Sequence, residues 1–249
     1  MAGQDSQPEL RGEPGDSEFQ QALELLSGSA GMEADPPQGM ALLRRVAERG
    51  LPDARRLLAR LLAGDPKHVG ESIALLRELT DAGDAEAMHL LGLLHFRGQG
   101  LDRDFVRARE LQQRAADGGA LDAAFELSLL LRQGIGGPPD LQRAEHYEAQ
   151  AAEEGHPRAC LNQGSHAASA SPPRYEQAGA WYERAAHGGS AEAAARLCRM
   201  LLAGVFGRPD GAAAWDWYVL ASDLGYRWES LFPELSNGAE GSMEPGEGG

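Results

Sequence analysis

The chain repeats a pattern of small and large apolar residues at intervals of 33 to 36 residues. Each interval ends in a glycine, at Gly50, Gly83, Gly119, Gly155, Gly189 and Gly225. Alanine follows five of these glycines after four positions, at Ala54, Ala87, Ala123, Ala159 and Ala193. A large apolar residue stands eight positions before each glycine, at Leu42, Leu75, Leu111, Tyr147, Trp181 and Trp217. Self-similarity at this period predicts stacked structural units.

The pattern of residues within each interval predicts two helices joined by a turn. Its apolar residues lie three or four positions apart, which is the helical spacing. Loops with glycine or proline separate the two apolar stretches, as in residues 97–101, 133–139 and 204–209. An aspartate is placed to cap three of the second helices: Asp104, Asp140 and Asp210. The recurrent glycine suits a left-handed C-terminal cap. Because one helix pair cannot cover its own apolar face, the pairs should stack into a solenoid.

The pattern predicts an all-α chain of about six helix-turn-helix repeats over residues 17–235. The expected repeats are 17–50, 51–83, 84–119, 120–155, 156–189 and 190–225, followed by a C-terminal cap at 226–235. Ser17 is expected to cap the first helix, and Pro36-Pro37 precedes the second. Residues 1–16 and 236–249 are rich in Gly, Glu and Pro, so we expect disordered acidic tails there.

Composition excludes several classes of protein. The formal net charge of −15 argues against general binding to nucleic acid or to an anionic membrane. No apolar run is long enough for a transmembrane helix, and residues 1–18 lack the regions of a signal peptide. Two cysteines cannot form a disulfide framework. We therefore expect a cytoplasmic protein. The single lysine, Lys67, beside abundant Ala, Arg and Gly is typical of a GC-rich source such as a bacterium.

Motifs for catalysis or metal binding are weak. Residues 98–100 read Gly-Gln-Gly but lack the strand, the later glycine and the lysine of a phosphate loop, so they indicate an inter-helix turn. Glu86 and His89 share a helical face, yet a di-metal site needs a second such pair. We interpret them as a surface pair near a helix start. No nucleophile elbow is present. We expect no enzyme, no cofactor and no metal.

Two stretches resemble a known family. Residues 87–119 read AMHLLGLLHFRGQGLDRDFVRARELQQRAADGG, and residues 177–189 read QAGAWYERAAHGG. They resemble Sel1-like repeats (SLR), relatives of tetratricopeptide repeats, and the resemblance extends over about residues 54–225. It implies a right-handed superhelix that serves as a non-enzymatic adaptor or scaffold and binds a protein partner. An inhibitor or immunity-type protein that occludes a toxin or an enzyme is the alternative, and an enzyme of unknown class is a remoter one.

The resemblance also bears on the cysteines. Some secreted members of the family join the two helices of a unit by a disulfide. Cys160 matches the first position of that bridge, but Ala186 stands at the second. We therefore expect no disulfide, and we expect Cys198 to be a small buried residue.

In tetratricopeptide-type superhelices the first helix of each pair lines the concave face. Helical periodicity then gives the candidate groove residues Arg56, Arg60, His89, Leu93, Phe96, Arg97, Phe125, Leu129, Arg132, Arg158, Asn162, Arg196 and Arg199. Arginine binds carboxylates through two parallel hydrogen bonds. The set therefore predicts a positive, partly aromatic groove for an extended acidic segment of a partner. Two alternatives remain: the acidic tails occupy the groove, or the arginines pair with neighbouring acids on the helix flanks.

Aromatic residues concentrate after residue 214, at Trp215, Trp217, Tyr218, Tyr226 and Trp228. Trp217 occupies the repeat position of a core residue. The others either close the open end of the solenoid or form a second candidate binding surface at Trp215 and Trp228. The sequence does not predict the oligomeric state.

Overall fold

The chain folds into helices throughout the part that the computed structural model describes, residues 14–28 and 33–228. These residues contain no strand. The helices are α1 (Pro14–Ser27), α2 (Pro36–Glu48), α3 (Pro52–Ala63), α4 (Val69–Asp81), α5 (Ala85–Arg97), α6 (Phe105–Asp117), α7 (Leu121–Gln133), α8 (Leu141–Glu153), α9 (Pro157–Ala168), α10 (Tyr175–His187), α11 (Ala191–Leu202) and α12 (Gly211–Asp223). The all-α repeat predicted from the spacing is confirmed.

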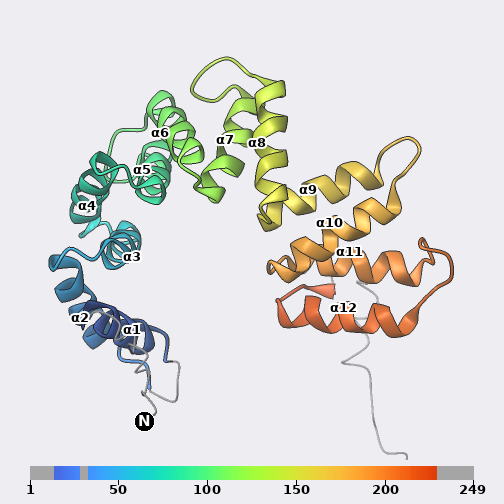
Figure 1. The fold of residues 1–249 in the computed structure, drawn as a ribbon, viewed down its shortest axis with the longest axis horizontal. Helices are drawn as coiled ribbons and strands as arrows, with labels where there is room; N and C mark the ends of the chain where they lie inside the picture. The colour runs from blue at the N-terminus through green and yellow to red at the C-terminus, as the bar shows by residue number, and fades with distance from the viewer. Residues whose placement is uncertain (1–13, 29–32, 229–249) are drawn as a thin grey trace, which may run out of the picture. The chain divides into compact units, whose positions relative to one another are not determined.

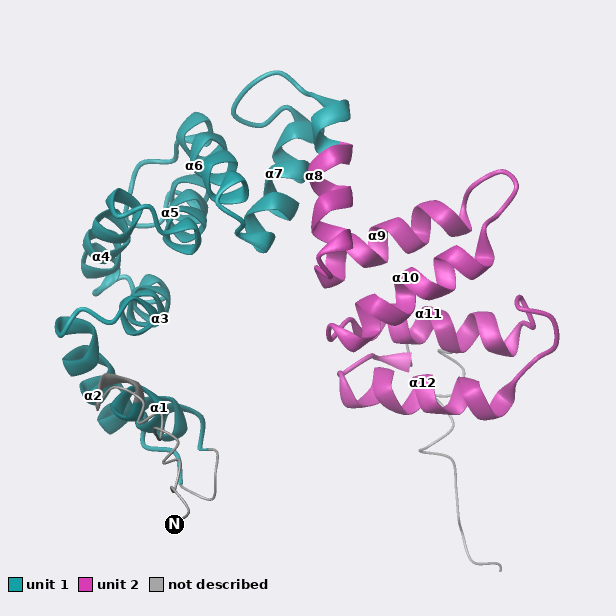
Figure 2. Ribbon diagram, in the orientation of Figure 1, with its two compact units in different colours: residues 1–144 teal, residues 145–249 magenta. Residues whose placement is uncertain are grey.

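Neighbouring helices pack in the order of the chain (Figure 1). Within the repeats α1 packs on α2, α3 on α4, α5 on α6, α9 on α10 and α11 on α12. Contacts divide the chain into two compact units, residues 1–144 and residues 145–249, with the boundary inside α8 (Figure 2). We call them unit 1 and unit 2.

The recurrent small residues form the helix contacts. The alanines four positions after the repeat glycines have no exposed surface: Ala54, Ala87, Ala123, Ala159 and Ala193. Leu58, Leu91, Leu127 and Leu197 follow them by one helical turn and are also buried. A methyl group lets a neighbouring helix approach closely, and the larger side chain beside it fills the remaining space. The repeat pattern therefore marks one continuous line of contact within each unit.

Helix ends follow the predicted caps. A carboxylate oxygen of each predicted capping residue accepts a backbone N–H three residues on, at 2.9 Å for Asp104 and at 3.0 Å for Asp140 and Asp210. All six repeat glycines have φ between +83° and +97°, the left-handed region that glycine adopts without strain. The expectation for Ser17 is wrong. Helix α1 begins at Pro14, so Ser17 lies inside it, because proline is well tolerated in a first helical turn.

The expected tails and cap lie largely outside the described residues. Helix α1 starts within the range assigned to the N-terminal tail, and residues 1–13 are not described. Of the expected cap, residues 226–228 are described. The remainder of the cap and the C-terminal tail at 236–249 lie outside.

Both cysteines are free and buried. Cys160 donates its thiol hydrogen to the carbonyl oxygen of Ala152 at 3.3 Å, and Cys198 is buried on α11. Burial raises the pKa of both thiols, because a thiolate would lose its hydration there.

We expect the two thiols to react slowly in the folded protein. Low accessibility and a raised pKa both reduce the population of reactive thiolate. Titration with a thiol-specific disulfide reagent should be slower by about tenfold or more than in denaturant, where two equivalents react. Rapid reaction of either thiol without denaturant would contradict the packing of α9 and α11.

Replacement of Gly164 should destabilise unit 2. A Cβ added to Gly164 on α9 would lie 2.5 Å from the ring of Tyr182, which is buried on α10. Overpacking costs about 1–3 kcal/mol, and the better helix propensity of alanine offsets about 1 kcal/mol of it. Gly164→Ala should therefore lower the free energy of unfolding by about 1–2 kcal/mol in a denaturant titration.

Gly70→Ala is the matched control. Gly70 lies in helix α4, and no atom would lie within 4 Å of its added Cβ. Its replacement should leave stability unchanged or raise it slightly. Equal stability of the two variants would contradict the close contact between α9 and α10.

Candidate protein-binding surface

A hollow in unit 1 is lined only by first helices of the repeats. In Figure 1, α3 and α5 lie on the inner side of this unit, with α2, α4 and α6 on the outer side. The hollow has a volume of about 450 Å³. Its lining comes from α1, α3, α5 and α7: Phe19, Leu23, Asp53, Arg56, Leu57, Arg60, Glu86, His89, Leu90 and Asp122. First helices alone thus form the wall of this one hollow.

A second hollow of about 200 Å³ adjoins the first, and the two share Arg60 and Leu90. Its other lining residues are Ala63, Gly64, Leu76, Leu93, Leu94, Arg97 and Gln99. We call the joined surface the unit 1 groove. Leucines form much of its floor, and charged side chains come from the helix ends.

The two hollows differ in charge because acids and arginines occupy opposite ends of the first helices. Asp53, Glu86 and Asp122 stand in the first turns of α3, α5 and α7, and all three line the first hollow. Arg60 and Arg97 stand in last turns and line the second. Each charge complements the helix dipole at its position. The groove is thus acidic toward one end and basic toward the other.

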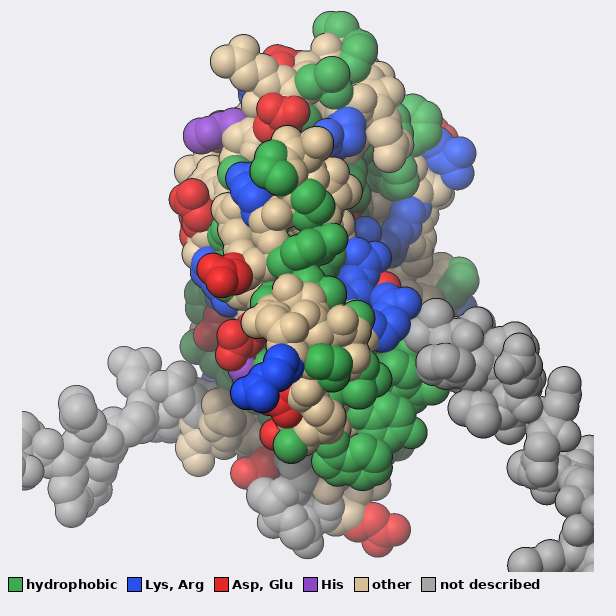
Figure 3. Space-filling view, turned by 90° about the vertical axis from the view of Figure 1, so that its right-hand side faces the viewer, with side chains coloured by type: hydrophobic (Ala, Val, Ile, Leu, Met, Phe, Trp, Pro, Cys, Tyr) green, Lys and Arg blue, Asp and Glu red, His purple; other side chains and the backbone are tan. Residues whose placement is uncertain are grey.

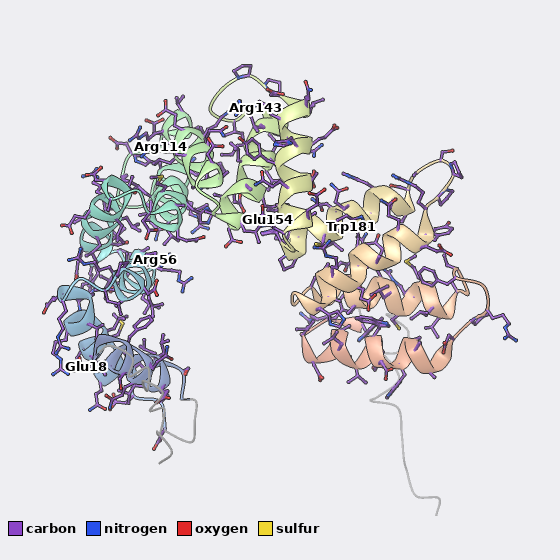
Figure 4. The ribbon with its side chains drawn as sticks, in the orientation of Figure 1. Glu18, Arg56, Arg114, Arg143, Glu154 and Trp181 are labelled. Carbon is purple, nitrogen blue, oxygen red and sulfur yellow. The ribbon has the colours of Figure 1, made fainter. Side chains whose placement is uncertain are left out.

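One groove arginine is held by the fold. The Arg56 guanidinium pairs with Asp53 in its own helix and with Asp84 at 3.4 Å. Asp84 also caps α5 by accepting the N–H of Ala87 at 2.9 Å. Arg56 therefore joins α3 to the start of α5, as the flank-pairing alternative predicted; Figure 4 labels it on the inner side of unit 1.

Two other groove arginines have no such partner. Neither the Arg60 nor the Arg97 guanidinium forms an ion pair or a hydrogen bond with any residue that the structure describes, and both side chains are exposed. Their hydrogen-bonding groups are available to a carboxylate from another molecule.

His89 is not the surface residue that its spacing from Glu86 indicated. It is only 6 % exposed. Its Nδ1 lies 2.8 Å from Oε1 of Gln112 on α6, and Nε2 of Gln112 donates to the His89 carbonyl oxygen at 3.2 Å. Gly92 makes room for this amide, since a Cβ there would lie 2.9 Å from it. The amide orientation assigns the ring proton to Nδ1.

The structure brings together five of the predicted groove residues in unit 1 and leaves others apart. Those in the groove are Arg56, Arg60, His89, Leu93 and Arg97. The prediction for Phe125 is wrong, because its side chain is 2 % exposed and belongs to the core. Phe96 packs on Phe105 of α6 with 5.4 Å between ring centroids. Leu129 and Arg132, both half-buried, line neither hollow.

The first hollow departs from the positive, partly aromatic groove that the sequence predicts. The first hollow contains three carboxylates and two arginines, and Arg56 is already paired. The three carboxylates of this hollow were not among the predicted groove residues. They occupy one repeat position, three residues after the glycine, so their recurrence was visible in the sequence. Phe19 and Leu23 were missed because the candidate positions were counted from Gly50, which leaves out α1.

In unit 2, two predicted residues line a hollow of about 320 Å³: Arg196 and Arg199. Arg196 is held by Glu192 at 2.8 Å and donates to the hydroxyl groups of Ser165 and Tyr182 at 2.6 and 3.2 Å. Burial alone would lower the pKa of Arg196, but the hydrogen bonds and electrostatic attraction of Glu192 and Tyr182 together outweigh burial and raise it.

The other two predicted residues in unit 2, Arg158 and Asn162, do not line that hollow. Asn162 instead donates to the buried Glu148 carboxylate at 2.6 Å. Its amide is therefore engaged in joining α9 to α8.

The aromatic residues near the end of unit 2 form a stacked row on α12. Trp215 and Tyr218 lie 5.2 Å apart between centroids, and Tyr218 and Trp228 lie 4.8 Å apart. Trp228 also donates to the Ser222 hydroxyl at 3.0 Å, whereas Trp215 is 62 % exposed. Figure 3 shows hydrophobic side chains low on the face of unit 2 that it views. Trp228 thus packs against α12, whereas Trp215 is largely exposed.

Within the described ranges, no group of three or more His, Cys, Asp or Glu side chains is arranged to hold a metal ion. No helix among these residues is both long and apolar enough to cross a membrane.

Solved structures with a similar fold include three bacterial proteins. A Sel1 repeat protein of Oxalobacter formigenes is 24 % identical, with a TM-score of 0.71 over 89 % of this chain and 65 % of that one. The protective antigen c5321 of uropathogenic Escherichia coli, which has an SLR fold, is 23 % identical, with a TM-score of 0.59 over 91 % of this chain. This chain spans 65 % and 50 % of the lengths of those two proteins.

The immunity protein Pa5087 of Pseudomonas aeruginosa is 19 % identical, with a TM-score of 0.62 over 94 % of this chain and 90 % of that one. Identities this low establish the fold alone. No curated protein matches the chain in sequence.

The Sel1 repeat family model matches five segments that together make up more than half of the chain. They are residues 16–51, 85–119, 121–156, 167–190 and 191–226. The match includes the α1–α2 pair, whereas the α3–α4 pair lies outside it. The repeats, the helix pairs and the family match agree, and the chain belongs to the Sel1 repeat family.

Proposed function

We propose that this protein is a non-enzymatic adaptor that binds a segment of a partner protein in the unit 1 groove. Sel1 repeat proteins generally mediate protein–protein interactions, and their fold is typically a non-catalytic scaffold. The observation that carries the proposal is the pair of exposed, unpartnered arginines, Arg60 and Arg97, beside a leucine floor.

The chemistry of the second hollow favours an apolar side chain followed by a carboxylate. Leu90, Leu93 and Leu94 offer apolar contact, and burial of such surface is the main source of affinity in most protein association. The arginines add charge-assisted hydrogen bonds that fix the position of the bound segment. An acidic partner segment, as the sequence predicts, is therefore still expected. Its carboxylate would bind at the basic second hollow.

Charge reversal at the two arginines should remove the partner. Hydrogen bonds to charged groups contribute about 1.5–3 kcal/mol, so Arg60→Glu with Arg97→Glu should weaken binding by about tenfold or more. Affinity capture from a lysate of the source organism, followed by titration of the purified partner, measures this. The thermal unfolding temperature should stay nearly constant, because neither guanidinium has a partner among the residues that the structure describes.

Arg114→Glu is the matched control. Arg114 is an exposed arginine on α6, a second helix, on the outer side of unit 1 (Figure 4). It should retain the partner. Loss of the partner from both the double reversal and the Arg114→Glu control would indicate a general charge effect and contradict the groove proposal. A partner retained by the double reversal but lost from Trp215→Ala would place binding on α12 and end the groove proposal.

A second candidate function is inhibition of a toxin or enzyme. The similarity of fold and length to the immunity protein Pa5087 favours it. Such a protein would bury a standard interface of about 1,200–2,000 Å² with a folded partner. A peptide copied from the partner would then bind far more weakly than the whole partner. In the adaptor proposal, the peptide keeps most of the affinity.

A further inference from the structure

The first hollow of the unit 1 groove contains two hydrogen-bond acceptors that the fold leaves without donors. The first is the Glu86 carboxylate, which forms no hydrogen bond or ion pair with any described residue. The second is Nε2 of His89. Because the ring proton is held on Nδ1 by Gln112, Nε2 carries a lone pair.

His89 is oriented by a specific arrangement. Its side chain is more than nine-tenths buried, yet it lines the hollow. Nδ1 points to Gln112 in the interior, which leaves Nε2 as the ring nitrogen at the hollow. No described residue donates to it. The Nε2 lone pair can therefore accept a hydrogen bond from a donor on another molecule that enters the hollow.

Glu86 and His89 act on the same site. They are three residues apart on α5, a spacing that places side chains on one helical face. Arg56 is paired with Asp53 and Asp84, so its charge is offset, and Asp122 is a further carboxylate in the lining of the same hollow. Arg60, where the hollow meets the basic hollow, is the remaining cation in the lining.

We propose that the first hollow binds a lysine or arginine side chain of the partner segment, which donates to Nε2 of His89 and to the Glu86 carboxylate. The aliphatic stem of that side chain would lie on Leu57 and Leu90. The inference rests on the proposed function, because it describes how the same groove selects its segment. The preferred segment combines a basic residue at this hollow, an apolar residue at Leu90 and an acidic residue at Arg60 and Arg97.

Selection from a phage-displayed library of short random peptides tests the inference on the full chain. The wild-type protein should enrich peptides that contain both Lys or Arg and Asp or Glu around an apolar residue. Glu86→Gln should reduce the enrichment of Lys and Arg by about tenfold, the loss expected for one charge-assisted hydrogen bond, and leave the acidic preference intact. Asp81→Asn removes an exposed carboxylate of α4 outside the groove and should select like the wild type.

The outcomes separate the two proposals. Two results would overturn the cation site alone. In one, the peptides selected by the wild-type protein are rich in acidic residues but not in Lys or Arg. In the other, the Glu86→Gln variant selects the same peptides as the wild type. If reversal of Arg60 and Arg97 leaves the enrichment of Asp and Glu unchanged while Lys and Arg stay enriched, the acidic part of the proposed function is overturned. A wild-type protein that enriches no peptide would overturn both.

Ring ¹⁵N spectra give a second readout. With labelled histidine, the His89 signals, identified by their loss in His89→Asn, should show the proton on Nδ1. A selected lysine-bearing peptide should shift the Nε2 signal, and the same peptide with norleucine in place of lysine should not. A proton on Nε2 in the free protein would contradict the proposed acceptor.

Discussion

The close approach of neighbouring helices through alanine is the constraint on which the rest of the structure depends. The repeat alanines on the first helices have no exposed surface. Replacement by larger residues would separate the helices, because a packed interior has no spare volume. This contact also fixes the rotation of each first helix about its axis. Once the rotation is fixed, Asp53, Glu86 and Asp122, which share one repeat position, face the same hollow.

The charge of the unit 1 groove follows from that register together with the helix dipole. Acids in first turns and arginines in last turns each stabilise their own helix. When first helices are held side by side, these charges add up to an acidic hollow beside a basic one. A feature that serves local helix stability thus becomes a pattern that another molecule can recognise. The bipolar groove therefore needs no charged residue placed there for binding alone.

Much of the fold was predictable from sequence because its causes are local. Helix pairs, aspartate caps and left-handed glycines depend on residues a few positions apart, and all were found. The site was predictable only in part, because exposure depends on neighbouring helices. Phe125 and His89 occupy the same repeat position, yet one is core and the other lines a hollow. Gln112 and Gly92, which orient His89, meet only in the folded chain.

Site-specific photo-crosslinking tests the central claim most directly. Leu90 belongs to both hollows of the groove, whereas Ala74 is exposed on α4, a second helix. A benzophenone amino acid at position 90 should form a covalent product with the partner, and the same group at position 74 should not. Crosslinking at position 74 or 215 without crosslinking at position 90 would contradict binding in the groove formed by the first helices.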